Sequence, residues 1–211
     1  LKIFGIICEY NPFHNGHARQ LEFCRSNGAD LIFCAMSGDF TQRGEPAVLE
    51  KRIRAKHAVQ SGADLVAELP LPYAAAGAKD FAEGGVKLLE KMGCTHICFG
   101  SECGNMSLLE NAAELIDSDS FNNSLKLHIK AGKSYPVSAE LAGEEYGGVL
   151  NAPNNILAVE YLRALKSVGS AMQPITLTRN TDYCSESLDS KACVASASAI
   201  RKNLKNERSE E

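Results

Sequence analysis

The sequence lacks any apolar run long enough to cross a bilayer, which needs about 20 consecutive residues. Its apolar start, from Leu1 to Cys8, is short for a signal peptide, and no small-residue cleavage site follows it. An excess of basic residues is also missing, because Lys and Arg total 22 against 26 for Asp and Glu, a net charge of -4. This balance argues against broad, non-specific nucleic-acid binding, although a local basic face remains compatible with it. We therefore expect a cytoplasmic protein.

The cysteines lack the spacing of a zinc knuckle, because no two of the eight are separated by two residues. Several lie in apolar runs, where Cys behaves as a small hydrophobe. One group could still bind a metal, because Cys94, His96 and Cys98 share one face of an extended strand and Cys103 follows closely. The same residues suit a buried parallel strand. We expect reduced, structural thiols, and metal binding by this group stays open.

The length of 211 residues, with 45% hydrophobic and 23% charged residues, indicates one globular domain with at most a small appendage. Near-continuous apolar runs alternate with helical patterns, which is typical of a parallel sheet buried on both faces. The predicted strands are 2–8, 30–36, 64–69, 94–99 and 173–178, and the predicted helices between them are 17–27, 47–61 and 79–92. The sequence thus predicts a doubly wound, Rossmann-like α/β fold whose strands end at one ligand-binding edge.

Residues 106–166 break this alternation and have helical patterns throughout, at 107–117, 121–131, 137–146 and 154–168. We expect them to form a helical insertion beside the sheet. From Ser196 the chain begins with a Ser/Ala run and continues as a short charged helix, and its last residues are expected to fray. On this interpretation residues 1–205 form one domain that includes the insertion, and 206–211 form a tail.

The loop after the first predicted strand has the residues for phosphate chemistry: Glu9-Tyr10-Asn11-Pro12-Phe13-His14-Asn15-Gly16-His17. It lies between the carboxyl end of a strand and a helix N-terminus, where Rossmann-like proteins hold phosphates. The dinucleotide glycine fingerprint and the Walker-type GxxxxGK[ST] motif are both absent from the sequence. Gly16 lets the backbone approach a phosphate, and His14 and His17 can both point at one phosphoryl group. Their imidazoles can donate hydrogen bonds to the charge that builds during an in-line displacement at phosphorus.

His14-Asn15-Gly16-His17 after a first parallel strand resembles the HxGH signature of the nucleotidylyltransferase superfamily. The resemblance is closer to one family within it, the bacterial tRNA(Met) cytidine acetate ligases, and it covers nearly the whole chain in the family's order. The blocks that carry it are 9–17 (EYNPFHNGH), 37–46 (SGDFTQRGEP), 62–70 (GADLVAELP), 99–102 (FGSE), 153–157 (PNNIL) and 196–201 (SASAIR).

The resemblance implies a Rossmann-like enzyme of the HxGH type that activates acetate with ATP, giving acetyl-adenylate and pyrophosphate. It then implies transfer of the acetyl group to N4 of the wobble cytidine of elongator tRNA(Met), with ATP and Mg²⁺ as cofactors. His14 and His17 would be catalytic, at the α-phosphate. The ATP-binding residues that it implies are Ile7, Cys8, Glu9, Tyr10, Asn11, Pro12, Phe13, His14, Asn15, Gly16, His17, Ala18, Arg19, Gln20, Gly100, Asn154, Arg179, Asn180, Ser198 and Arg201.

Several other polar features keep two interpretations each. Ser198 and Arg201 fit an anion site at a helix start, or Ser198 is a plain N-cap. Arg43, in a Gly-flanked loop, could contact phosphate or RNA or tie the loop down. Glu68, at the end of a strand, could be a site carboxylate or a structural one. A basic run on the second helix could touch RNA phosphates, but such runs are more often a solvated face; its members are Lys51, Arg52, Arg54, Lys56 and His57.

Two departures from the family bear on activity. Tyr183-Cys184-Ser185 stands where family members have Tyr-His-Asp, and family members are longer, with a C-terminal region implicated in tRNA binding. We therefore expect tRNA binding to need that region. Two alternatives stay open: an adenylyltransferase of the same fold acting on another small acceptor, and a nucleotide-binding module without turnover. The oligomeric state also stays open.

Overall fold

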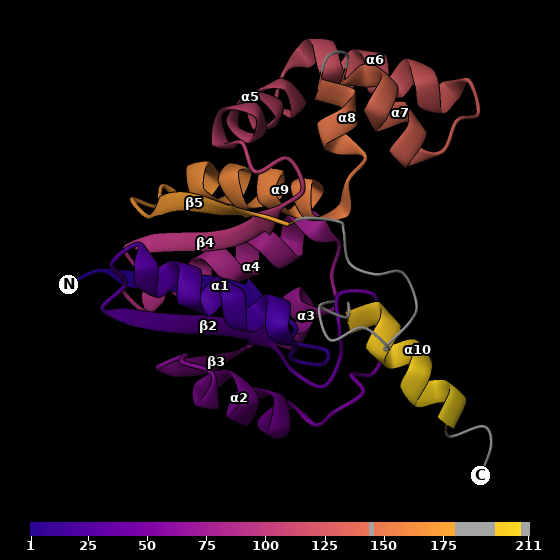
Figure 1. The fold of residues 1–211 in the computed structure, drawn as a ribbon. Coiled ribbons are helices and arrows are strands. Elements are labelled where there is room, and N and C mark those ends of the chain that lie inside the picture. The colour runs from indigo at the N-terminus through magenta and orange to yellow at the C-terminus, as the bar shows by residue number, and fades with distance from the viewer. Residues whose placement is uncertain (144–145, 180–196, 208–211) are drawn as a thin grey trace.

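Five parallel strands form one sheet in the order β3-β2-β1-β4-β5 (Figure 1). The computed structural model describes residues 1–143, 146–179 and 197–207. The parallel α/β sheet predicted from the apolar runs is confirmed, because every predicted strand is present. The strands are β1 (Ile3–Cys8), β2 (Leu31–Ser37), β3 (Leu65–Leu69), β4 (His96–Ser101) and β5 (Gln173–Thr178).

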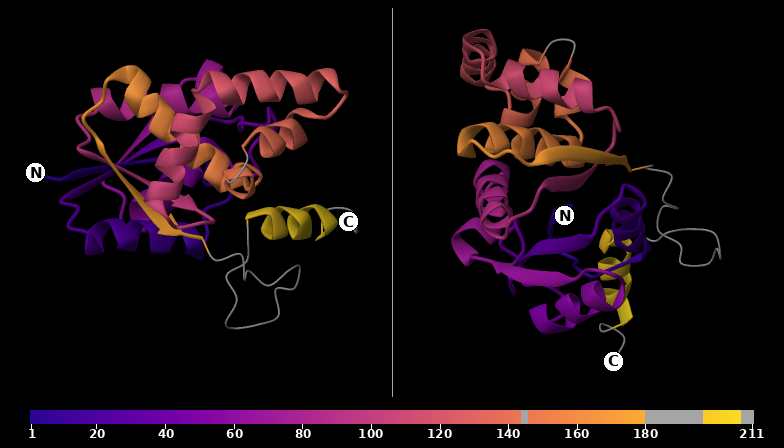
Figure 2. Two further views of the ribbon diagram at one scale, coloured as in Figure 1. Left: turned by 90° about the horizontal axis from the view of Figure 1, so that it is seen from above. Right: turned by 90° about the vertical axis from the view of Figure 1, so that its left-hand side faces the viewer.

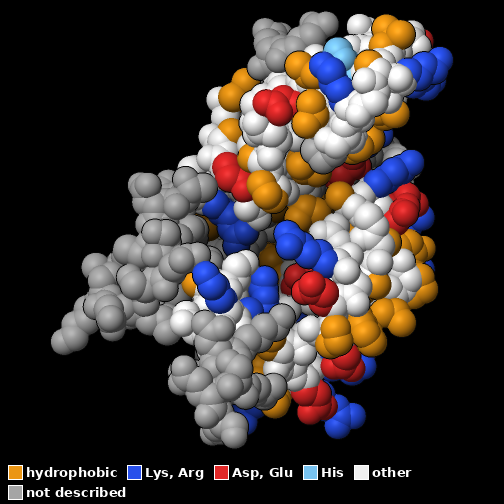
Figure 3. Space-filling view, turned by 90° about the vertical axis from the view of Figure 1, so that its right-hand side faces the viewer, with side chains coloured by type: hydrophobic (Ala, Val, Ile, Leu, Met, Phe, Trp, Pro, Cys, Tyr) orange, Lys and Arg blue, Asp and Glu red, His pale blue; other side chains and the backbone are white. Residues whose placement is uncertain are grey.

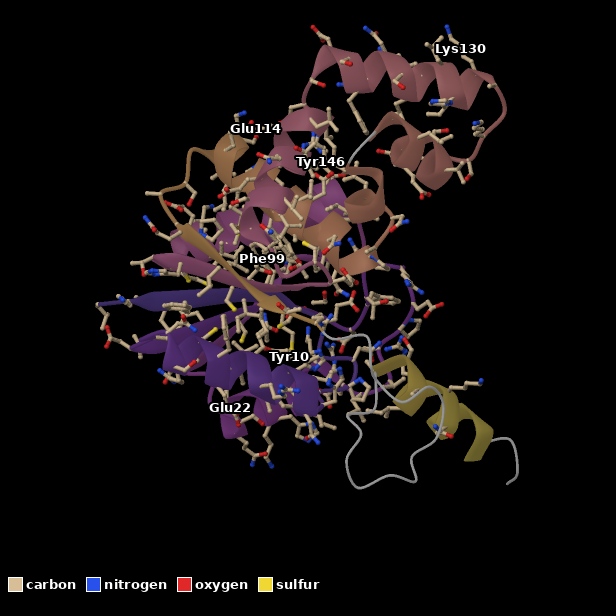
Figure 4. All side chains as sticks on the ribbon, turned by 45° about the horizontal axis from the view of Figure 1, so that its top comes forward. Tyr10, Glu22, Phe99, Glu114, Lys130 and Tyr146 are labelled. Carbon is tan, nitrogen blue, oxygen red and sulfur yellow. The ribbon has the colours of Figure 1, made fainter. Side chains whose placement is uncertain are left out.

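Helices cover both faces of the sheet, as Figure 2 shows from above and from the side. On one face α1 (Asn15–Ser26) and α2 (Lys51–Gln60) bury Leu21, Cys24 and Ala58 against β1 and β2. On the other face α4 (Ala78–Lys91) and α9 (Pro153–Val168) form a second core layer with β4. Because apolar side chains alternate between the two faces of each strand, the sheet is buried on both sides. Tyr10 and Phe99, which are labelled in Figure 4, belong to opposite layers.

Glycines allow α4 to approach β1 closely. A Cβ atom added to Gly5 of β1 would lie 2.6 Å from Cδ1 of Leu89, and one added to Gly85 of α4 would overlap Ile7. Real Cβ contacts are not this short, so neither position has room for a side chain. The close contact holds β1 against α4. A short helix, α3 (Leu71–Ala74), connects β3 to α4 and was not predicted.

The helices after β4 divide into two groups. Four of them form a lobe beyond the sheet (Figure 1): α5 (Met106–Ile116), α6 (Asp119–Lys130), α7 (Tyr135–Ala142) and α8 (Gly147–Leu150). The helix predicted at 154–168 is α9, which packs on α4 and β4 through buried residues such as Ala158 and Val159. It therefore belongs to the layer that covers the sheet, and the lobe is shorter than the expected insertion of 106–166. The last described helix, α10 (Ala197–Glu207), lies near the carboxyl edge.

The cysteine group considered as a metal site does not converge. Cys94 lies in the core layer beneath α4, whereas Cys98 lies in the layer beneath α1. The His96 ring stacks on Phe4, with ring centroids 4.4 Å apart. Within the described ranges, no three His, Cys, Asp or Glu side chains are grouped so that they could hold a metal ion. None of the described helices combines the length and the apolar composition that crossing a membrane requires.

Candidate functional site

The candidate site lies at the carboxyl edge of the sheet, between β1 and β4. The chain leaves β1 toward β2 on one side and leaves β4 toward β5 on the other, so the strand order reverses here. Open α/β sheets bind ligands in the crevice outside such a switch point. The 9–17 loop follows β1, and Gly100 and Glu102 lie at the end of β4. The predicted phosphate loop is therefore at the edge where ligands bind in this class of fold.

His14 and His17 cap the N-terminus of α1 with their imidazole rings. His14 is the N-cap residue, and its Nδ1 accepts a hydrogen bond of 3.0 Å from the backbone N–H of Gly16. Nδ1 of His17 accepts one of 3.3 Å from the backbone N–H of His14. Together they form a capping box, a role more usually filled by Ser or Thr with Glu. Because an accepting ring nitrogen carries no proton, each imidazole keeps its proton on Nε2.

The two rings are stacked, with centroids 3.7 Å apart and planes inclined by 22°. The two imidazoles therefore lie side by side, as the spacing of the motif led us to expect. Burial, helped by the charge of Arg179, lowers the pKa of His14 to about 4. Burial also lowers the pKa of His17, and the charges of His14 and Arg179 add to the effect. Both rings are therefore neutral at pH 7 and offer Nε2–H donors beside the positive end of the α1 dipole.

A second group of side chains at this edge positions Arg179. Its Nη1 donates to Oδ1 of Asn154 at 2.5 Å, and its side chain covers Gly100, where a Cβ atom would lie 2.8 Å from Cγ and Cδ of Arg179. Asn154 is itself held by Glu102, whose carboxylate accepts from the Asn154 backbone and side chain and from the backbone N–H of Asn155. Glu102 thus satisfies the first amides of α9. The structure brings Gly100, Asn154 and Arg179 together, as the family resemblance implied, and adds Glu102 as their support.

Several predicted ATP-binding residues turn their side chains into the protein. Tyr10 is buried, and its hydroxyl lies 3.6 Å from the Cys34 thiol. Oδ1 of Asn11 accepts from the backbone N–H of Val48 at 2.9 Å. The Gln20 amide donates to the carbonyl of Cys98 in β4 at 3.1 Å. These residues shape the loop, so any contact of Tyr10 or Asn11 with a nucleotide has to use the backbone.

The start of α10 lies against the phosphate loop. Nη1 of Arg201 donates to the backbone carbonyl of Asn11 at 2.6 Å, and Nη2 donates to Oγ of Ser198 at 3.1 Å. Segments 190 positions apart in the sequence are thus joined at the site. Ser198 is exposed and Arg201 is half-buried. Asn180 and the Tyr183-Cys184-Ser185 triplet lie outside the described residues.

Among the residues that the structure describes, Arg54 is the largest side chain that is fully buried, with 0% of its surface exposed. Its guanidinium donates to four backbone carbonyls, those of Leu49 (2.9 Å), Glu9 (2.6 Å), Ser37 (3.2 Å) and Gly38. The suggestion that Arg54 could touch RNA phosphates is therefore wrong, because the side chain does not reach the surface. Instead, Arg54 ties the phosphate loop at Glu9 to the loop after β2. The sequence does not predict this role, because Arg54 stands in a run of basic residues that is typical of an exposed helix face.

The other polar features that kept two interpretations have surface positions. Lys51 pairs with Glu68 at 2.9 Å and with Asp39 at 3.7 Å, so Glu68 is part of an exposed ion-pair group. Arg52 is 87% exposed, and Lys56 is exposed as well, while His57 is half-buried. Arg43 is also exposed. Arg52 and Lys56 are thus the members of the basic run that lie fully at the surface.

The whole chain, residues 1–211, matches the family model described as HIGH Nucleotidyl Transferase. It is 43% identical over 216 residues to the tRNA(Met) cytidine acetate ligase of Acetivibrio thermocellus, covering 97% of this chain and 52% of that protein. It is also 43% identical over 214 residues to the protein of the same name from Syntrophotalea carbinolica, covering 97% and 51%. The chain therefore spans about half the length of the curated relatives it matches.

Solved structures agree with these relatives. Thermotoga maritima TmcAL bound with alpha-thio ATP superposes with a TM-score of 0.86 at 35% sequence identity, covering 100% of this chain and 52% of that one. The apo form of the same protein superposes with a TM-score of 0.88 at 34% identity, covering 100% and 53%. The matching fold and the match along the full chain, with the HxGH loop at the switch point of the sheet, place this protein in the HIGH nucleotidyl transferase family.

Proposed function

We propose that this chain activates acetate with ATP and supplies the acetyl group for N4 of the wobble cytidine of elongator tRNA(Met). The observation that carries the proposal is the pair of neutral, stacked imidazoles at the N-terminus of α1, with Arg179 close enough to affect their pKa values. The names of the relatives and the alpha-thio ATP in the Thermotoga maritima structure support this substrate pair. We further propose that the reaction takes place in the cytoplasm.

In the proposed complex the triphosphate lies across the start of α1. His14, Gly16 and His17 would surround the α-phosphate, and Gly100 would lie near the base. Arg179, held by Asn154, would neutralise phosphate charge, and Ser198 and Arg201 would contact phosphate from α10. Mg²⁺ would enter with the phosphates, since divalent magnesium is commonly bound through substrate oxygens and few protein ligands. The remaining residues from Ile7 to Gln20, together with Asn180, complete the proposed ATP site.

The proposed chemistry needs positioning and charge stabilisation more than a strong base. Acetate is ionised at neutral pH, so its carboxylate oxygen can attack the α-phosphorus directly while pyrophosphate leaves in line. The Nε2–H groups of His14 and His17 would donate to the α-phosphoryl oxygens as negative charge builds there. In the second step the cytidine N4 attacks the acetyl carbon, AMP leaves with the bridging oxygen, and N4 loses a proton.

Acetate-dependent exchange of labelled pyrophosphate into ATP tests the activation step. We expect exchange in the wild type when acetate is present, a large loss in His14→Ala and His17→Ala, and none of that loss in the control variant His57→Ala on α2. Exchange that requires another carboxylate or small acceptor would favour an adenylyltransferase of the same fold. ATP binding without exchange for any acceptor would favour a nucleotide-binding module, and either result would overturn the proposal.

A further inference from the structure

Most of α6 and α7, together with the turn between them, has an unusual charge pattern for this chain, with Asp119 and Glu140 at its two ends. From Ser120 to Ala139 it contains Lys126, Lys130 and Lys133, together with His128, and no Asp or Glu. The whole chain has a net charge of -4, so acidic residues outnumber basic ones elsewhere. A local stretch of this kind creates a positive field that the average composition hides.

The three lysines are exposed and close to one another. Lys126 and Lys130 are four residues apart on α6, about 6 Å along the helix axis, and Lys133 lies in the turn that follows. None of the three forms an ion pair within the part of the chain that the structure describes. The helix dipole stabilises cations in the last turn of α6, but Lys126 and Lys130, four residues apart, repel each other. Their charge is therefore available to an anionic partner.

Exposed apolar side chains lie among these lysines. Leu127 is 68% exposed and Tyr135 is 64% exposed, although α6 already packs on its neighbours through the buried Phe121. Leu127 and Tyr135 are therefore not needed to fill the core of the lobe. Lysines that alternate with an exposed aromatic ring and aliphatic groups suit single-stranded nucleic acid, because lysines contact phosphates while rings stack on bases.

The position of this surface relates it to the candidate site. Figures 1 and 2 show that α6 and α7 extend past the sheet on the side of its carboxyl edge, with Lys130 near the end of the lobe in Figure 4. Figure 3 looks onto that edge, where Lys and Arg side chains gather near the middle of the face and recur over the upper lobe. A polymer with one nucleotide in the crevice could therefore continue along the lobe.

We infer that the tip formed by α6 and α7 (residues 120–139) is an RNA-binding surface that holds the strand next to the modified nucleotide. This inference rests on the proposed function. Lys126, Lys130 and Lys133 contact phosphates, and Tyr135 provides a stacking surface. Because the contacts are to the backbone and to base faces, the surface adds affinity and orientation, while the crevice selects the reacting base.

The test compares two triple variants of the 211-residue chain with the same change in charge. One is Lys126→Ala/Lys130→Ala/Lys133→Ala, and the control is Lys79→Ala/Lys91→Ala/Lys166→Ala, three exposed lysines on α4 and α9. Binding to a fluorescent anticodon stem-loop of tRNA(Met) is measured by anisotropy across a range of salt concentrations. The stem-loop replaces the whole tRNA because tight binding of the whole tRNA is expected to need the C-terminal region of the longer relatives, whereas the lobe is proposed to contact only the strand next to the modified nucleotide. Each lost phosphate contact lowers the slope of log K against log salt by about 0.7 to 0.9. We expect the lobe variant to lose about 2 in slope and to bind about tenfold more weakly, while the control matches the wild type.

A stacking role has its own pair of variants: Tyr135→Ala weakens binding, and Tyr135→Phe restores it. Equal RNA affinity and salt slope in the two triple variants would overturn the inference, as would a wild type that binds no RNA. The proposed activation of acetate is measured separately, by pyrophosphate exchange without RNA, which the lobe variant should retain in full. If the wild type shows no acetate-dependent exchange, the proposed function is wrong. If the two triple variants bind RNA equally, the RNA-binding role of the α6–α7 tip is wrong.

Discussion

Replacing Arg54 by Met should destabilise the protein far more than a surface Arg→Met change would. The side chain is fully buried and donates to the carbonyls of Leu49, Glu9, Ser37 and Gly38. Met fills much of the same space but donates no hydrogen bond. Arg54→Met therefore leaves up to four carbonyl groups without their donor in a region that water does not reach.

The size of the effect follows from two opposing contributions. A hydrogen bond from a charged donor contributes about 1.5 to 3 kcal/mol, so four of them could total about 6 to 12 kcal/mol if they were independent. They share one guanidinium, and its removal from water costs several kcal/mol, which Met does not incur. The burial that lowers the pKa of Arg54 reflects that same cost. We therefore expect a net loss of about 3 to 5 kcal/mol in the free energy of unfolding.

Urea unfolding measures this loss, with Arg52→Met as the matched control on the same helix. Arg52 is 87% exposed, so its replacement should change the free energy of unfolding by less than about 0.5 kcal/mol. Arg54→Lys should be intermediate, because an ammonium has three donors without the planar geometry of a guanidinium. If Arg54→Met lies within about 1 kcal/mol of Arg52→Met, the role assigned to Arg54 is wrong.

Three further predictions concern residues of the candidate site. His17→Ala should slow acetate-dependent pyrophosphate exchange by roughly 10² to 10³, the effect of losing one transition-state donor, with a much smaller change in ATP affinity by calorimetry; equal losses in both would refute a catalytic role. Gly100→Ala should weaken ATP binding roughly tenfold by displacing Arg179, whereas Gly148→Ala, where a Cβ meets nothing within 4 Å, should not. His14 has a folded pKa of about 4 against 6.5 when exposed, so its neutral form stabilises the fold above pH 6.5, and that stability is lost as the pH falls toward 4. After allowance for partial exposure, the wild type should lose about 1 kcal/mol more than His14→Asn between pH 7 and pH 5 in urea unfolding, and parallel losses would contradict this.

The strands and most helices could be predicted from the sequence because local patterns determine them. Apolar runs mark β1 to β5 within two residues, and β5 coincides with its predicted range of 173–178. The predicted helix at 47–61 is too long, since α2 begins only at Lys51. The residues before it are held by distant partners instead: the Ala47 N–H donates to the Asp39 carbonyl, and the Val48 N–H donates to Asn11. Such long-range contacts leave no periodic signal.

In the candidate site, too, the sequence predicts the local features but not the long-range contacts. Its motif, its position after β1 and the closeness of the two imidazoles could be predicted, because strand, loop and helix follow each other in the sequence. The beginning of α1 at Asn15, two residues earlier than the predicted 17, could not, because histidines are unusual helix caps. Glu102 and Arg54 were not recognised as supports, because their partners are 52 and 45 positions away. The sequence predicts that the lobe is helical, but no local pattern shows that α9 packs on α4 and β4 and not in the lobe.

In the proposed reaction, acetate attacks the α-phosphorus of ATP at the His14–His17 loop. Labelled acetate carrying ¹⁸O in both carboxyl oxygens tests it directly, with ATP, Mg²⁺ and hydroxylamine as a small acceptor for the acetyl group. We expect acetohydroxamate and AMP in equal amounts, with one ¹⁸O in each AMP, in the wild type and in His57→Ala but not in His14→Ala/His17→Ala. AMP without ¹⁸O, or ¹⁸O in inorganic phosphate, would contradict it.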